Sequence, residues 1–248
     1  MEQVKQVKKA LREYAEPEKA AFLPKFFQAF PGGYGEGDQF LGIRVPNTRK
    51  VAKAYPLPLE QLTDLICSAF HEERFFALVV MCQHYQKAKS DDEQQAVLAF
   101  YQRYIKYVNN WDLVDCSAPK VVGPFIWRQQ DWKLLEQFAS STSMWQQRIA
   151  MVSCFYYIRQ NDVDITITLA KRFHTHSHPL MHKAVGWMLR ELAKRNKPAV
   201  EEFLQQHLSV LPRELLRYSI EHFDEPLRQS YLSGSIVESY LSGSIVES

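Results

Sequence analysis

Helical periodicity is the feature that most restricts what this chain can fold into. Along most of its 248 residues, apolar side chains recur at spacings of three and four, and alternation with a period of two is nearly absent. Such spacing gathers apolar residues on one face of an α-helix. Clear examples are "VKQVKKALREYA", "EERFFALVVMCQHYQKA" and "PLMHKAVGWMLRELAKRN". The sequence therefore predicts an all-α fold.

Short breaks separate the helical segments. They include "YPLP" at 55–58, "KSDDE" at 89–93, "RQNDVD" at 159–164 and "HSHP" at 176–179. Helices joined by so few residues pack antiparallel, and roughly 35 to 45 residues per helix pair is the period of helical-repeat proteins. We therefore expect an α-solenoid of antiparallel helix pairs.

Two segments do not follow the helical pattern. The glycine-rich stretch "FPGGYGEGDQFLGIRVP" at 30–46 cannot be a regular helix and is predicted to be an ordered loop between early helices. At the other end, "YLSGSIVES" at 231–239 recurs letter for letter at 240–248. We expect one helical-repeat domain over residues 1–228, followed at 229–248 by a disordered or artificial duplicated tail without function.

Composition indicates a soluble, intracellular protein. With 46% hydrophobic and 23% charged residues the chain can bury a sizeable core, and it has no run of about 18 apolar residues. Its four cysteines are widely spaced and form no Cys-x-x-Cys pair, which is typical of a reducing compartment. We expect a cytoplasmic protein that neither enters a membrane nor is secreted.

Trp111 and Asp115, in "YVNNWDLVDCSAPKVVG" at 107–123, lie one helical turn apart. Their spacing places an aromatic face and a carboxylate side by side. On spacing alone, a core tryptophan with a capping carboxylate explains the pair better than a functional site does. Other helices also combine aromatic and cationic residues, because Arg148 follows Trp145 and Trp187 is flanked by cations.

Charge is unevenly distributed although the whole chain carries only +2. Residues 165–200 contain seven Lys or Arg and one acidic residue, a local charge of +6, whereas three basic and six acidic residues follow position 212. A basic concave surface suits a phosphate backbone, and a solvated helix face is the simpler alternative. The candidate phosphate contacts are Arg44, Lys183, Arg190, Lys194, Arg195 and Lys197, and Arg49, Lys50 and Lys53 can add to them.

Four histidines fall within "FHTHSHPLMH" at 173–182. Their His-x-His spacing lacks a nearby carboxylate and does not reproduce a His-Glu-x-x-His helix or a Cys/His ligand set. We expect a polar turn and neither a metal site nor a cofactor.

From about residue 3 to about residue 225, the sequence resembles the AlkD-type DNA alkylation repair glycosylases, a family built from HEAT-like repeats. The resemblance is carried by "FLGIRVP" at 40–46, "WDLVD" at 111–115, "MWQQR" at 144–148 and "KAVGWMLRELAK" at 183–194, in the family's order. It implies a right-handed α-solenoid of HEAT-like antiparallel helix pairs with a concave basic face. It also implies that Trp111, Asp115, Arg148 and Trp187 are the active-site residues. The sequence departs from the family pattern at Asn110, at Arg44 and in the longer "PGGYGEGDQ" loop.

The resemblance also implies a function. Family members hydrolyse the N-glycosidic bond of N3- and N7-alkylated purines in duplex DNA, without drawing the lesion into a deep base-specific pocket. It therefore predicts a metal-free, monomeric base excision repair enzyme that needs no cofactor and no protein partner. A non-catalytic HEAT-like module for branched or damaged DNA is the main alternative, and a protein-binding scaffold is a third.

Overall fold

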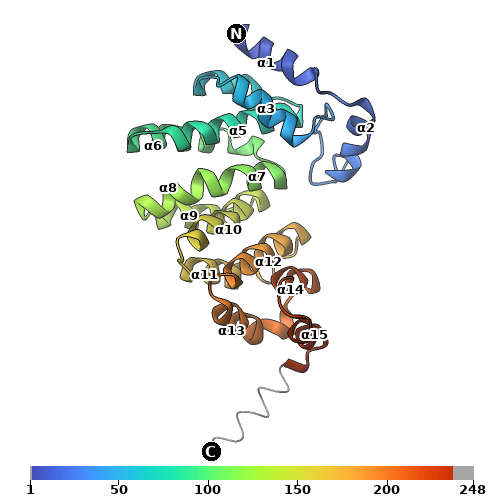
Figure 1. The fold of residues 1–248 in the computed structure, drawn as a ribbon, viewed down its shortest axis with the longest axis vertical. Coiled ribbons are helices and arrows are strands. Elements are labelled where there is room, and N and C mark those ends of the chain that lie inside the picture. The colour runs from blue at the N-terminus through green and yellow to red at the C-terminus, as the bar shows by residue number, and fades with distance from the viewer. Residues whose placement is uncertain (1, 237–248) are drawn as a thin grey trace, which may run out of the picture. The chain divides into compact units, whose positions relative to one another are not determined.

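The computed structural model describes residues 2–236, so most of the duplicated tail lies outside the described residues. Within that range the chain forms fifteen α-helices and four short 3₁₀ turns, and its only β-type pairing is one isolated bridge between Gln39 and Phe70. The described residues are helical with no strand, which confirms the predicted all-α fold class (Figure 1). The chain divides into two compact units, residues 1–129 and 130–248.

The first unit contains eight α-helices. They are α1 (Glu2–Arg12), α2 (Pro17–Phe26), α3 (Val45–Ala54), α4 (Thr63–Ile66), α5 (His71–Lys87), α6 (Asp91–Arg103), α7 (Trp111–Ser117) and α8 (Val122–Gln129). Helix α5 is central, because α3, α4, α6 and α7 all pack against it, and most of its residues are buried. Its core side chains include Phe76, Leu78 and Met81.

The second unit contains the other seven. They are α9 (Trp132–Ala139), α10 (Met144–Arg159), α11 (Asp164–Phe173), α12 (Pro179–Ala193), α13 (Lys197–His207), α14 (Arg213–Ser219) and α15 (Glu225–Ser233). Helix α12 is the centre of this unit, with α10, α11, α13 and α14 against it. A Cβ on Gly186 would lie 2.5 Å from Tyr218 Cβ and 2.8 Å from the Leu215 carbonyl oxygen, so the absent side chain permits the close approach of α14 to α12.

Helices α6 and α12 start at breaks that the sequence predicted. Ser90 accepts a hydrogen bond from the Glu93 amide at the start of α6. The "HSHP" turn precedes α12, where His178 accepts from the Leu180 amide and the His176 ring lies 2.9 Å from Gln147 Oε1. These contacts confirm the predicted polar turn.

The C-terminal prediction needs one correction. Residues 229–233, placed in the disordered tail, complete α15, where Tyr231 is buried and packs edge-on against Phe223. Packing of the Tyr231 ring against Phe223 favours continuation of the helix through this position, and the repeated letters do not reveal that contact. The expected single domain of residues 1–228 stays a prediction.

None of the described helices combines the length and apolarity that crossing a membrane requires. The four cysteines are free thiols, three of them buried and Cys67 half-buried.

Candidate active site

The glycine-rich segment, predicted at 30–46 to be an ordered loop, does connect α2 to α3. In the structure this glycine-rich loop covers residues 27–44, because Val45 and Pro46 begin α3. Its last part is fixed by the Glu72 carboxylate, which accepts hydrogen bonds from the amides of Leu41, Gly42 and Ile43 at 3.0, 2.8 and 3.1 Å. Gly42 has φ +79°, and a Cβ there would lie 2.2 Å from the Glu16 carbonyl oxygen. The "LGI" motif is therefore held by α5 and lies tightly against the start of α2.

Trp111 is the first residue of α7, and Asp115 lies one turn further along the same helix, as their spacing predicts. Asn110 is fully buried, and its Oδ1 accepts from the Trp111 amide at 2.8 Å. The departure from the family pattern at Asn110 is therefore a buried side chain at the helix start.

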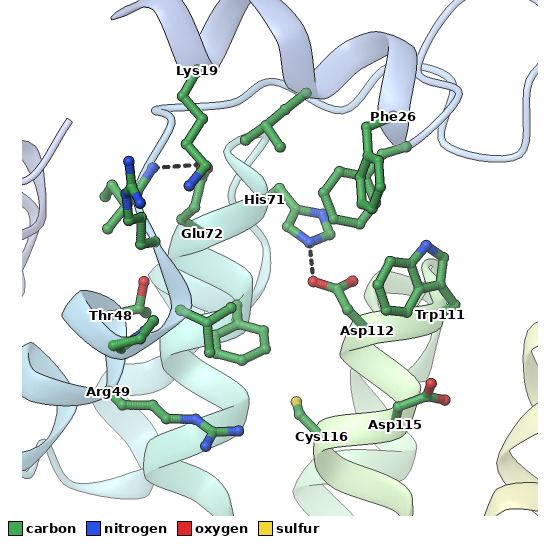
Figure 2. A pocket seen from close by; sticks show the side chains of 17 residues that line it. Lys19, Phe26, Thr48, Arg49, His71, Glu72, Trp111, Asp112, Asp115 and Cys116 are labelled. Carbon is green, nitrogen blue, oxygen red and sulfur yellow. Dashed lines mark hydrogen bonds and ion pairs between the residues drawn. The ribbon is translucent and has the colours of Figure 1, made fainter. Parts of the chain in front are cut away.

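A cavity of about 670 Å³ lies among α2, α3, α5, α7 and the end of the glycine-rich loop. Trp111, Asp112, Asp115 and Cys116 form its α7 wall, and His71 and Glu72 belong to α5. Lys19, Arg44 and Arg49 line it as well, so carboxylates and cations face one space (Figure 2). Figure 2 shows Arg49 on α3 across this space from Asp115 on α7.

A buried ionic network supports the start of α7. His71, 3% exposed, contacts Asp112 Oδ2 through Nε2 at 2.8 Å and Asp38 Oδ2 through Nδ1 at 3.1 Å. Arg74 contacts the same Asp38 oxygen at 2.6 Å. Burial by itself would lower the pKa of His71, but the Asp112 charge and the hydrogen bonds to both carboxylates raise this pKa to about 9. The ring is therefore an imidazolium at neutral pH.

Sequence reasoning missed this network. Its signal is the run of four titratable residues at the start of α5, "HEER" at 71–74, all of them buried. Four consecutive charged residues cannot all face solvent from a helix that is buried on most sides, and buried charges require partners. Glu73 finds its partners in Lys8, Arg12 and Ser68.

Rings form a continuous series from the surface into this site. Trp111 stacks on Phe27 with centroids 5.5 Å apart and an interplanar angle of 24°, and Phe26 meets Trp111 edge-on at 6.1 Å. Phe27 also lies against the His71 ring at 4.7 Å. The stack fixes one face of Trp111, while the side chain keeps partial exposure on the cavity wall.

The other two predicted site residues lie in the second unit, on the adjacent helices α10 and α12. Arg148 is 4% exposed and donates a hydrogen bond to the Leu180 carbonyl in the first turn of α12. Trp187 is partly exposed, and its ring lies 5.8 Å from that of Phe155. Each unit thus contains one of the two partly exposed tryptophans among the predicted site residues.

Most predicted phosphate contacts have carboxylate partners. Lys183 pairs with Glu214 at 3.3 Å, Arg190 with Glu221, Lys194 with Glu191 at 2.8 Å, and Lys197 with Glu201 and Asp224 at 3.6 and 3.9 Å. Arg44 pairs with Glu16 at 2.8 Å. Three of these cations, Lys183, Arg190 and Lys197, therefore pair with carboxylates that follow position 212. Arg195 is exposed.

Helix α3 differs from those basic segments. Arg49, Lys50 and Lys53 are exposed, and no acidic residue occurs in the helix. Among residues 2–236, the Arg49 side chain has no ion pair or hydrogen bond, while the Lys50 ammonium lies over the Tyr14 ring, 5.5 Å from its centroid. Arg49 therefore offers an unpaired guanidinium at the cavity that contains Trp111 and Asp115.

Fold and site together define an all-α protein with an aromatic–carboxylate pair beside a basic helix. The chain belongs to the DNA alkylation repair enzyme family, whose model matches residues 7–223. A solved structure described as a predicted DNA alkylation repair enzyme from Enterococcus faecalis is similar over 85% of this chain and 97% of its own, with a TM-score of 0.66 and 21% identity. That likeness shows a shared fold. Comparison with curated proteins gives no significant match.

Proposed function

We propose that this protein is a DNA glycosylase that hydrolyses the N-glycosidic bond of cationic N3- and N7-alkylated purines in duplex DNA. The observation that carries the proposal is the pairing of Asp115 with Trp111 on one wall of a cavity with cations opposite, in a member of this family. Membership of the family indicates that the process is DNA alkylation repair. The type of reaction is our inference from the site.

The reaction suits a site that has a carboxylate and does not supply a proton to the base. An alkylated purine already carries a positive charge, so it departs as a neutral base with the electrons of the C1′–N bond. Water then forms the new bond to C1′ and gives up a proton. Positive charge grows on the deoxyribose, and the Asp115 carboxylate would stabilise it and orient the water, as carboxylates do in glycoside hydrolysis.

The aromatic residues fit a cationic nucleotide. An indole face attracts a cation by about 0.5 to 2 kcal/mol. We assign this role to Trp111, whose other face is covered by Phe27, and to Trp187. A neutral purine lacks both this attraction and the activated leaving group, so it should react poorly.

The existing ion pairs of the cationic side chains decide which of them we assign as phosphate contacts. Arg148 is nearly buried, and Lys183, Arg190, Lys194 and Lys197 contact carboxylates, so DNA binding through them has to compete with existing partners. Arg49 needs no such exchange. We therefore add Arg49 to the proposed phosphate contacts, next to Arg44 and Arg195.

The decisive experiment measures release of free base from duplex DNA containing 7-methylguanine. Parent protein should release base and leave alkali-labile abasic sites without added metal. Asp115→Asn keeps the shape of the side chain and removes its charge, so it should bind the duplex normally and lose excision by about 100-fold or more. Full activity in Asp115→Asn contradicts the mechanism, and salt-dependent binding without any base release by the parent would favour the non-catalytic module.

A further inference from the structure

Helix α2 is unusual because it contributes no buried residue to the fold. Phe22 is 57% exposed and Phe26 is 51% exposed, one turn apart on the same side of the helix. Their rings lie 6.1 Å apart at a tilt of 32°. Large apolar side chains exposed together usually mark an interaction surface.

The end of α2 explains why two adjacent phenylalanines point different ways. Pro24 lies inside the helix, and α2 ends at Phe26, after which Gln28 takes a positive φ of 49°. Phe27 turns inward and is buried beneath Trp111, whereas Phe26 remains outside. The turn thus separates an exposed pair of rings from the supporting ring of the candidate site.

One ring of the exposed pair, Phe26, also belongs to the candidate site. Phe26 lies 6.1 Å from Trp111 at an interplanar angle of 69° and lines the same cavity, as Figure 2 shows. Lys19 lines this cavity too, and Lys25 is exposed on the same short helix. Aromatic rings bordered by cations match the two parts of a nucleotide, a flat base and an anionic phosphate.

We propose that Phe22 and Phe26 form a stacking surface for unstacked nucleobases next to the lesion, so that α2 separates the damaged nucleotide from its neighbour in the duplex. The inference rests on the proposed function for its substrate. Apolar wedges that enter a base step weaken the local stacking, and the contacts they make offset that cost. The surface thereby gives this protein a means of opening the duplex beside Trp111 and Asp115.

The test uses full-length protein and a duplex in which 2-aminopurine flanks a stable abasic-site analogue. Binding by the parent should raise 2-aminopurine fluorescence, because the probe brightens when it unstacks. Phe22→Ala should lower the affinity about 10-fold and abolish most of the fluorescence rise. Phe22→Trp keeps a ring and should retain both signals, whereas Phe22→Leu keeps only apolar area and should lose the fluorescence rise.

Val210→Ala is the matched control, since Val210 is also an exposed apolar side chain but belongs to the second unit. It should behave as the parent. Because α2 buries no residue, all variants should share the parent's melting temperature. Unchanged affinity and fluorescence in Phe22→Ala overturn the proposal, as does a parent that binds this duplex without unstacking the probe.

Excision of 7-methylguanine, measured on the same proteins, separates this proposal from the proposed function. If the parent releases base and Phe22→Ala behaves identically in every assay, the stacking surface is wrong and the glycosylase assignment stands. If the parent releases no base while Phe22→Ala still loses the fluorescence rise, the stacking surface stands and the glycosylase assignment fails.

Discussion

Nε2 of His71, on α5, lies 2.8 Å from Oδ2 of Asp112, on α7, and this ion pair joins the two helices beside Trp111. Asp112 follows Trp111 directly and precedes Asp115 by three residues. The pair therefore bears on the orientation of both candidate catalytic residues, although neither of them takes part in it.

Asp112→Asn should lower the pKa of His71 and the stability of the protein. The parent His71 has a pKa of about 9, above the 6.5 of an unfolded chain, so its contribution is complete below pH 6.5 and is lost as pH rises through 9. Removing the Asp112 charge should cost about 2 to 3 kcal/mol at pH 6. Urea unfolding across this pH range and an NMR titration of the His71 ring measure both effects.

His71→Gln provides the comparison for that prediction. Without an ionisable ring, the stability difference from the parent should be largest near pH 6 and shrink toward pH 10. Asp38 and Arg74, which also contact this cluster, remain in both variants. A stability difference that does not change with pH would rule out a charged His71.

Gly42→Ala should destabilise the protein more than Gly37→Ala. Both glycines have a positive φ, +79° and +86°, so both substitutions strain the backbone. A Cβ on Gly42 also meets the Glu16 carbonyl oxygen at 2.2 Å, whereas one on Gly37 meets nothing within 4 Å. The clash should add about 1 to 3 kcal/mol, measured by urea unfolding. Equal losses would show that the loop can move away from α2.

Arg49→Gln should weaken duplex binding and reduce the slope of log affinity against log salt by about 1. The physical reason is the loss of one exposed guanidinium at the cavity. Lys50→Gln is the matched control, with the same charge change on the same helix, because the Lys50 ammonium already lies over Tyr14. Fluorescence anisotropy at several salt concentrations measures the slopes, and equal effects of the two variants would contradict a specific role for Arg49.

Local spacing predicted a good part of this protein. The periods of three and four indicated helices throughout, and the separation of Trp111 from Asp115 correctly placed them together on α7. The glycine-rich segment was correctly expected to be an ordered loop. These features depend on residues within about one helical turn of each other, where the geometry of the backbone fixes which side chains share a face.

Long-range partners were decided by tertiary packing. The sequence did not indicate that Glu72 would hold the amides of 41–43, that His71 would lie between Asp38 and Asp112, or that Lys183 would pair with Glu214. It also predicted that a disordered or artificial tail begins at residue 229, whereas residues 229–233 belong to α15 and Tyr231 is buried. Such contacts join residues that are far apart in the chain, and only the packing of whole helices determines which charges meet and which, like Arg49, stay exposed.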